Sequence, residues 1–383
     1  MTQEPPTTAD FATAAGTQRF AARHRAHTAA DAYGLAGDLT VSSVGMGTYL
    51  GRADDATDKA YVQALVDAVR LGVNVLDTAT SYRCQRSERS VGRALDLLIQ
   101  AGEISRDELV VTSKAGFVPY DGKTPANPLQ WAHERTVQQG LCTADELWGG
   151  CHCLAPDFVT AMVAQSLQNL GIRTLDVYFL HNPEAQLQTV DPTLLEDRLR
   201  RAFASLEAAA DAGHLQAYGV ATWSGLRALP GERDHLSLER LVRCAHDVAG
   251  DRHRLRAVQL PISLGGPEAL VRRDQLVQGE AVSALQAAAR LGLTVFAAGP
   301  LLQGRLARTG PPSGVVAQGP ASHLSAAALA LHFARSVPGV ATALVGTSDR
   351  RHVVENAGLL RLDKASRAWV DEAARVPVGA RLP

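Results

Sequence analysis

One strand–helix–strand unit decides the fold class of this chain. Residues 175–181 have the sequence LDVYFLH, residues 192–212 the sequence PTLLEDRLRRAFASLEAAADA, and residues 217–220 the sequence AYGV. The two short apolar runs are typical of parallel strands buried on both faces, and the longer stretch between them has helical periodicity. Such a βαβ unit predicts a sheet covered by helices.

The same alternation recurs along the chain from residue 41 onward. Between the predicted strands lie helical stretches at 57–71, 88–100, 156–170, 192–212, 280–291 and 325–336. The predicted strands cover residues 41–47, 73–77, 109–114, 175–181, 217–220, 257–260, 294–298 and 342–346. Eight such pairs predict a closed (β/α)8 TIM barrel. A doubly wound open sheet is the alternative, but no G-x-G-x-x-G turn follows the first strand.

Organisation outside this repeat is simple. Residues 1–30 lack apolar periodicity and are interpreted as a mobile or loosely packed tail, and residues 31–383 as a single barrel domain. Residues 33–40 contain Gly34 and Gly37 and predict a hairpin that plugs the bottom of the barrel. A long insertion follows the third strand, and residues 303–324 form a second long connection, both on the face where barrel active sites are built.

Composition excludes several classes of function. The 383 residues carry 38 Lys+Arg and 39 Asp+Glu, so a nucleic-acid surface is not expected. No apolar segment is long enough to span a membrane, and no signal peptide is recognisable, so we expect a cytoplasmic protein. Five cysteines in a long chain indicate reduced thiols.

Titratable residues end three of the first four predicted strands. Asp77, Lys114 and His181 each follow an apolar run, and Tyr82 lies five residues after Asp77. Because parallel strands end at the same rim, these four side chains are expected to share one site. Lys114 is notable because the chain contains only four lysines and otherwise uses arginine.

These residue types together suggest a tuned acid. A free phenol titrates near pH 10, so an ammonium beside Tyr82 is expected to lower its pKa toward neutrality. Asp77 would hold Lys114 charged, and His181 would orient a substrate oxygen. This combination suits proton transfer to a carbonyl oxygen while a hydride reaches its carbon. Structural roles, such as a helix N-cap for Asp77 or packing for Tyr82, remain the alternatives for each residue alone.

At this point the sequence resembles the aldo-keto reductase family between residues 41 and 358. The matching motifs are VGMGT (44–48), LDTATSY (76–82), VTSK (111–114), DVYFLHN (176–182), GPLLQG (299–304), VGTS (345–348) and Glu355-Asn356. The resemblance implies an NADP(H)-dependent oxidoreductase acting on an aldehyde, ketone or sugar, an aldose dehydrogenase included. Tyr82 would be the general acid/base, with Asp77, Lys114 and His181 as its supports.

The resemblance also implies a set of cofactor contacts. A short helix is expected to open at residues 346–348, and its amides would receive the adenosine phosphate. Arg350 and Arg351 lie beside it and could bind the 2′-phosphate, so NADP(H) is favoured over NAD(H). A clamp over the pyrophosphate is expected at 305–322. The implied cofactor-binding residues are Thr48, Tyr49, Asp77, Thr222, Gln259, Leu301, Gly346, Thr347, Ser348, Arg350, His352, Glu355 and Asn356.

The sequence also departs from the family pattern. Ala221-Thr222 replaces the frequent Ser-Asn, Ala298 replaces an aromatic residue, and Gly346 and His352 stand where basic residues are usual. The insert at 117–155 is expected to form a lid or substrate wall. Its Cys151-His152-Cys153 could in principle bind zinc, but the spacing fits no known pattern, so no metal is expected and His152 is a candidate substrate contact.

A second hypothesis is a barrel protein that binds the nucleotide but catalyses no reaction. In that reading the protein senses a nucleotide and regulates a partner, and the N-terminal tail is the feature in its favour. The expected ligands remain a small carbonyl or alcohol substrate and the cofactor, with no nucleic acid and no membrane, and any protein partner is left unspecified.

Overall fold

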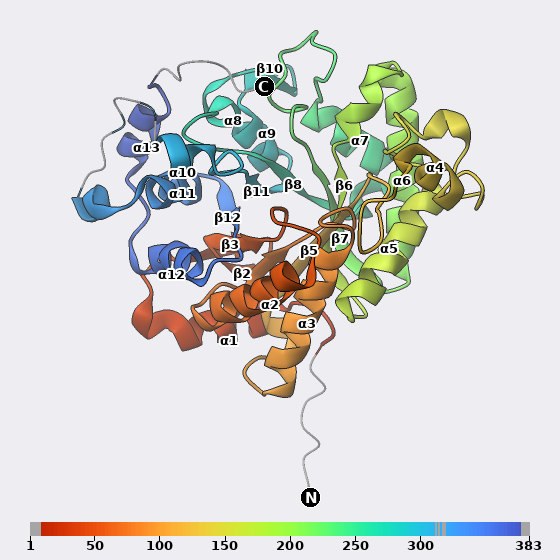
Figure 1. The fold of residues 1–383 in the computed structure, drawn as a ribbon. Helices are drawn as coiled ribbons and strands as arrows, with labels where there is room; N and C mark the ends of the chain where they lie inside the picture. Colours follow the sequence, from red (N-terminus) through yellow and green to blue (C-terminus); the bar gives the residue numbers. More distant parts are fainter. Residues whose placement is uncertain (1–8, 311, 313–314, 316–318, 377–383) are drawn as a thin grey trace, which may run out of the picture.

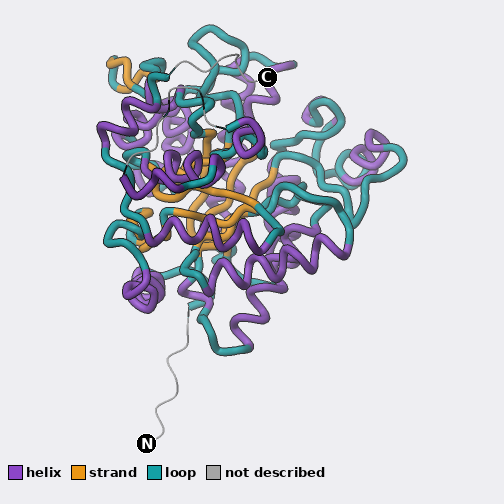
Figure 2. Tube along the Cα trace, turned by 60° about the vertical axis from the view of Figure 1, so that its left-hand side comes forward, coloured by secondary structure: helices purple, strands orange, loops and turns teal. Residues whose placement is uncertain are grey.

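The computed structural model describes residues 9–310, 312, 315 and 319–376. Its centre is a closed barrel of eight parallel strands, which confirms the predicted (β/α)8 architecture and excludes the open sheet. Figures 1 and 2 show these strands in the middle of the molecule, with helices around them. In order around the barrel, the strands are β11 (Thr294–Ala298), β12 (Val340–Gly346), β3 (Val44–Gly47), β4 (Val75–Asp77), β5 (Val110–Ala115), β6 (Leu175–His181), β7 (Leu215–Ala221) and β8 (Leu255–Pro261).

Helices of the outer layer begin where the sequence supplies caps. Asp54, Asp191 and Ser325 each accept a hydrogen bond from a backbone N–H of the first turn that follows, which stabilises a helix start by about 1 kcal/mol. The helices that follow barrel strands or complete the outer layer are α2 (Asp55–Arg70), α3 (Arg86–Gln100), α5 (Pro156–Leu170), α6 (Pro192–Asp211), α7 (Leu238–Ala249), α9 (Ala284–Arg290), α11 (Ala326–Ser336) and α12 (Arg350–Gly358). The shorter helices are α4 (Pro128–Arg135), α8 (Glu268–Val271), α10 (Arg305–Thr309) and α13 (Arg367–Ala373).

The helix predicted over 280–291 is wrong in its first part. The strand β9 (Gln275–Val277) pairs antiparallel with β10 (Glu280–Val282), and the helix α9 starts only at Ala284. The chain reverses at Gln278 and Gly279, both with positive φ, and this two-residue turn closes a hairpin. A hairpin therefore takes up the first residues of the apparent helical period.

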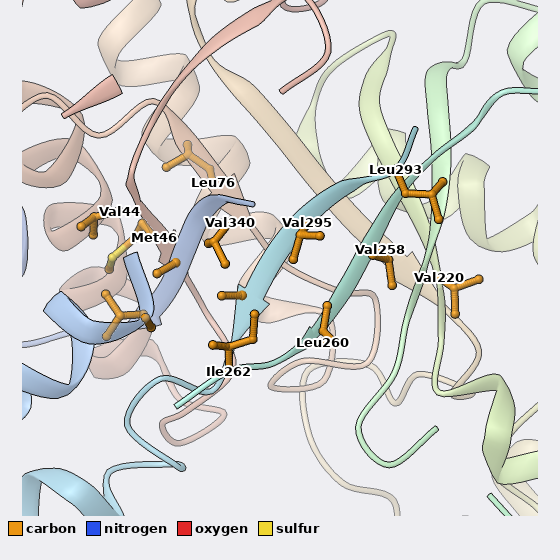
Figure 3. Close-up of a cluster of buried hydrophobic side chains, with 14 of the residues drawn as sticks. Val44, Met46, Leu76, Val220, Val258, Leu260, Ile262, Leu293, Val295 and Val340 are labelled. Atoms are coloured by element: carbon orange, nitrogen blue, oxygen red, sulfur yellow. The ribbon is translucent and has the colours of Figure 1, made fainter. Parts of the chain in front are cut away.

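Side chains of the barrel strands alternate between two cores. Along β4, Val75 belongs to the cluster inside the barrel and Leu76 to the cluster between the barrel and the helices. Inside the barrel the rings of Phe179 and Phe296 meet edge to face at 5.6 Å. Figure 3 shows part of the larger cluster, with apolar side chains such as Val258 carried by the barrel strands. The strands are buried on both faces, as their continuous apolar sequences predict.

The predicted hairpin at the bottom of the barrel is present. The strand β1 (Tyr33–Ala36) pairs antiparallel with β2 (Leu39–Ser42), and Val41 is buried in the cluster inside the barrel. The prediction of a loose tail is wrong for residues 9–30. There the helix α1 (Ala14–His24) buries Phe20 completely and forms ion pairs to Asp107 and Glu108. Residues 1–8 lie outside the described residues.

Among the helices of the described residues, none combines the length and apolar content needed to cross a bilayer.

Candidate active site

Three neighbouring strands bring the predicted titratable residues to one rim. Asp77 ends β4, Lys114 lies near the end of β5, and His181 ends β6, and these strands are adjacent in the barrel. Asp77, Tyr82 and His181 line a cavity of about 510 Å³, and Lys114 is fully buried beneath them. The four residues therefore lie together, as their positions in the sequence indicated.

Asp77 and Lys114 form a buried ion pair. The Lys114 Nζ lies 2.7 Å from Asp77 Oδ2 and donates a second hydrogen bond to the Thr78 carbonyl at 2.8 Å. Asp77 Oδ1 accepts from the Thr112 hydroxyl at 2.7 Å and from the Gln259 amide at 2.9 Å. Burial lowers the pKa of Lys114, and the charge of Asp77 opposes that effect. The carboxylate thus keeps an ammonium in a dry site.

Tyr82 has the predicted neighbour but not the predicted pKa. The Lys114 Nζ lies over the face of the Tyr82 ring, 4.9 Å from its centroid, as in a cation–π contact. Burial raises the pKa of Tyr82 well above its usual value, and the charge of Asp77 and the neighbouring Tyr49 raise it further. The expected lowering of this pKa is therefore wrong: desolvation of the phenolate dominates, and the charge of Asp77 disfavours ionisation further. The phenol keeps its proton.

His181 is a neutral imidazole at the rim. Burial lowers its pKa well below the usual value, and the positive charge of Lys114 lowers it further. Its ring meets Tyr82 edge to face, with 5.7 Å between centroids, and meets Phe117 at 5.2 Å. A neutral ring can donate one hydrogen bond into the cavity without adding a charge to it.

A strained loop presents Tyr82 to the cavity. The three following residues, Arg83, Cys84 and Gln85, all adopt left-handed backbone conformations with φ between 49° and 67°. Such conformations are costly for residues other than glycine and persist only where the surroundings hold them. Arg83 is held by the Arg52 carbonyl at 2.9 Å and by Asp58, and Gln85 donates to the Tyr120 carbonyl at 3.1 Å.

Several residues expected to contact the cofactor line the same cavity. They are Thr48, Tyr49, Asp77, Thr222, Gln259, Leu301 and Gly346. Gln259 donates its amide hydrogen to Asp77 at 2.9 Å, and the Thr222 hydroxyl donates to Glu184 at 2.8 Å. At Gly346 an added Cβ would lie 2.9 Å from the Gly47 carbonyl oxygen, so the rim between β12 and β3 has no room for a side chain. A bare-backbone rim with amide and hydroxyl groups beside Tyr82 fits a nicotinamide ring and its carboxamide.

The region around α12 differs from the expectation. The helix starts at Arg350, not at 346–348, and Asp349 caps it by accepting from the Arg351 N–H at 2.9 Å. This hydrogen bond and the Arg351 guanidinium lower the pKa of Asp349 to about 2. Arg350 pairs with Asp67 at 3.0 Å and Arg351 with Asp349 at 2.7 Å. A carboxylate therefore occupies the helix end where an anion was expected.

The remaining cofactor candidates lie near α12 and outside the lining of the cavity. Asn356 is buried on this helix, Glu355 is half-buried and His352 is exposed; Thr347 and Ser348 are half-buried just before it. The expected clamp at 305–322 falls partly outside the described residues, since 311, 313–314 and 316–318 are not described.

The long insert covers α5 and α6 more than the mouth of the barrel. Figure 1 shows α4 at the edge of the molecule beside α5 and α6. Insert residues Cys142 and Cys153 share an apolar cluster with Phe158 of α5, and Glu146 pairs with Arg201 of α6 at 2.8 Å. Within this insert, Phe117 alone lines the cavity described above. The insert therefore supplies one wall residue, and the prediction of a lid fits only at that point.

His152 is not a substrate contact, because its side chain is fully buried and does not line the cavity. Among the described residues, no three His, Cys, Asp or Glu side chains are grouped so that they could hold a metal ion.

Sequence reasoning missed three residues at the site. Phe117 follows Lys114 by three residues, and Trp223 follows Thr222; both line the cavity. Glu184 is buried after β6, and one of its oxygens accepts hydrogen bonds from the backbone N–H groups of Trp223 and Ser224 at 2.8 and 3.0 Å. The sequence signal was their position just after strand ends, where polar and aromatic residues merit attention.

Comparison with known proteins finds similarity to one family. A sequence model described as the Aldo/keto reductase family matches residues 43–230. The chain is 29% identical over 149 residues to the "NADH-specific methylglyoxal reductase" of Escherichia coli, covering 38% of this chain and 39% of that protein. It is 26% identical over 197 residues to the "NADPH-dependent codeinone reductase 1-2" of Papaver somniferum, covering 50% and 49%. The chain thus spans less than half the length of these two relatives.

Solved structures agree on the fold. An aldo/keto reductase from Klebsiella pneumoniae in complex with NADP and acetate superposes with a TM-score of 0.59 at 20% identity, over 91% of this chain and 95% of that one. The aldose reductase from Schistosoma japonicum gives 0.55 at 15% identity, over 89% and 90%. The Aldo/keto reductase family model thus covers residues 43–230 of this chain, and the solved structures share its barrel fold.

Proposed function

We propose that this protein is an NADP(H)-dependent oxidoreductase that transfers a hydride between the nicotinamide and a carbonyl or alcohol carbon. The observation that carries this proposal is the arrangement of Tyr82, Lys114 and Asp77: a phenol ring at the cavity wall lies against a buried ion pair. Aldehydes, ketones and aldoses are the substrate classes, in either direction of reaction.

In this mechanism Tyr82 holds the proton that the substrate oxygen receives. The cofactor, when bound, supplies or accepts the hydride. Because burial raises the pKa of Tyr82, its hydroxyl stays protonated until negative charge develops on the substrate oxygen. Lys114 places positive charge beneath the ring, where it stabilises the phenolate left after proton transfer. His181, beside Tyr82, donates a hydrogen bond to the substrate oxygen.

The residues proposed to hold the cofactor are those of the rim. Gln259 and Thr222 would contact the carboxamide. Thr48 and Tyr49 directly follow β3, and Gly346 presents bare backbone to the cavity, where the dinucleotide would lie. Arg350 and Arg351 would leave their ion pairs with Asp67 and Asp349 and bind the 2′-phosphate of the cofactor instead. NADP(H) carries this phosphate and NAD(H) does not, so we favour NADP(H). Thr347, Ser348, His352, Glu355 and Asn356 would take the adenosine end.

The test is substitution of the acid. Tyr82→Phe removes one hydroxyl and is expected to lower turnover about 10²–10⁴-fold, while the affinity for the cofactor stays near that of the wild type. Tyr120→Phe is the matched control, because this insert tyrosine does not line the cavity. Aldehydes, ketones and aldoses are screened with NADPH and NADH by nicotinamide absorbance. Turnover that survives Tyr82→Phe would show that the acid is another group.

The regulatory alternative makes a different prediction in the same screen. A nucleotide sensor would bind the cofactor tightly and turn over none of these substrates. The feature that favoured it was a mobile tail, and residues 9–30 of that tail are packed against the barrel.

A further inference from the structure

The insert reaches the catalytic rim through one buried side chain, His152. Its backbone is fixed by isolated β-bridges to Phe117 and Trp148. On either side of it, the Val118 N–H donates to the Cys151 carbonyl and the Cys153 N–H to the Gly116 carbonyl, both at 2.7 Å. His152 is thus held in place before its side chain is considered.

The imidazole of His152 bonds directly to the backbone of His181. Its Nε2 lies 2.7 Å from the His181 carbonyl oxygen, which can only accept, so Nε2 carries the hydrogen. The other nitrogen, Nδ1, then accepts from the Gln186 amide at 2.9 Å. The Gln186 side-chain oxygen accepts in turn from Arg198, which also donates to the Asp145 carbonyl at 2.9 Å. These partners fix both the tautomer and the orientation of the ring.

Electrostatics keep this ring neutral. Burial lowers the pKa of His152 to about 4, and the nearby positive charge of Arg198 adds to that effect. The bond to the His181 carbonyl acts in the opposite direction but does not outweigh burial, and the neutral ring leaves Nδ1 free to accept from Gln186.

The backbone is shaped to permit this contact. A Cβ added at Gly116 would lie 2.5 Å from the His181 carbonyl oxygen and 2.9 Å from His152 Nε2. The φ of Gly116 is +153°, and glycine alone leaves space for the two groups to meet. The ring of Phe117 lies 4.9 Å from that of His152 and 5.2 Å from that of His181. The insert therefore contacts His181 through both a hydrogen bond and a ring.

We propose that His152 is a positioning residue for the reaction: by bonding the carbonyl of His181, it fixes the strand end from which that imidazole faces Tyr82. This inference rests on the proposed function. The insert, on this view, shapes the reaction from outside the cavity. The carbonyl belongs to the last residue of β6, and the next residue, Asn182, turns into a left-handed conformation with φ 50°. Without its partner the partly buried carbonyl would rotate toward another donor, and the His181 ring would move with it.

The experiment compares two replacements of His152. His152→Phe keeps the ring shape and removes the hydrogen bond, and it is expected to lower kcat about 10–100-fold, the cost of a displacement near 1 Å. KM and cofactor affinity are expected to stay within about 2-fold, since His152 touches neither ligand. His152→Gln places an amide N–H near the position of Nε2 and is expected to restore kcat to within about 3-fold of the wild type. Cys142→Ala, elsewhere in the insert core, is the control for general loosening.

A second readout does not depend on activity. In the unliganded protein with 15N-labelled histidine, the ring signals of His181 are expected to shift in His152→Phe and to return in His152→Gln. Unchanged signals and unchanged kcat in His152→Phe would overturn the proposal. So would a loss of kcat that simply follows the loss of thermal stability in both His152→Phe and Cys142→Ala.

Two further outcomes are separable. If His152→Phe does not fold, Gln186→Met is the deciding variant, because it removes the donor to His152 Nδ1. A lower kcat at an unchanged melting temperature then supports the proposal. An unchanged kcat refutes it. If the wild type turns over no carbonyl substrate, the proposed function fails, whereas the His181 signals still test the contact with His152.

Discussion

Replacing Lys114 by Met tests the buried ion pair that supports the candidate acid. Asp77 would keep its bonds to Thr112 and Gln259, but its charge would lose the partner at 2.7 Å, and the Thr78 carbonyl would lose a donor. Breaking a buried pair from one side costs about 3–5 kcal/mol. Unfolding entropy of about 2.1 cal/mol/K per residue gives ~0.8 kcal/mol/K for 383 residues, so the melting temperature should fall by ~4–6 °C.

A double-mutant cycle read by calorimetry and denaturant titration separates stability from catalysis. Lys114→Met combined with Asp77→Asn removes both charges and is expected to regain about 2 kcal/mol or more relative to Lys114→Met alone. Both variants are expected to be inactive. If the double variant is as unstable as the sum of the two single changes, the two charges are not coupled, and the reasoning about this site is wrong.

Three more changes test groups of the site and one buried histidine of α11, His332. Because burial raises the pKa of Tyr82 well above 10, kcat/KM for carbonyl reduction should stay flat from pH 7 to pH 10; a fall with an apparent pKa below 9 would mean that the Lys114 charge dominates after all. Gly346→Ala should weaken cofactor binding, measured by fluorescence titration, because its Cβ would meet the Gly47 carbonyl at 2.9 Å; unchanged affinity would exclude this rim from the cofactor site. Burial lowers the pKa of His332 to about 4, so as the pH falls from 6.5 to 4 the unfolded chain binds the proton first and stability is lost in that window. His332→Gln should therefore flatten the pH dependence of unfolding by about 1 kcal/mol per pH unit, and an unchanged slope would contradict the lowered pKa.

The barrel could be predicted because parallel strands buried on both faces appear in the sequence as continuous runs of apolar residues. The predicted bounds of β6 and β11 agree with the structure, and the other barrel strands shift by only a few residues. The helix expected over 280–291 failed because Gln278 takes a left-handed conformation that glycine or asparagine would usually signal. Helix α1 was missed because only a few buried residues, chiefly Phe20, pack it against the rest of the protein. A single aromatic residue gives no helical periodicity that the sequence could show.

The site was predictable in position but not in electrostatics. Strand ends alone brought Asp77, Lys114 and His181 together, because the topology fixes where parallel strands finish. The direction of the Tyr82 pKa shift depends on how much solvent the fold removes, and on Asp77 neutralising the ammonium, which no sequence pattern gives. The path of the insert was equally hidden, since its contacts with α5 and α6 depend on distant surfaces.

The docking of α1 constrains how the chain folds during its synthesis. The Ala12 N–H donates to Asp176 at 2.6 Å across 164 residues, and Arg19 pairs with Asp107. At roughly 5–20 residues per second, a ribosome needs about 8–30 s to deliver Asp176 after Ala12. Throughout that interval the Ala12 N–H has no native acceptor. The segment that leads into α1 therefore completes its native contacts only after β6 has been made.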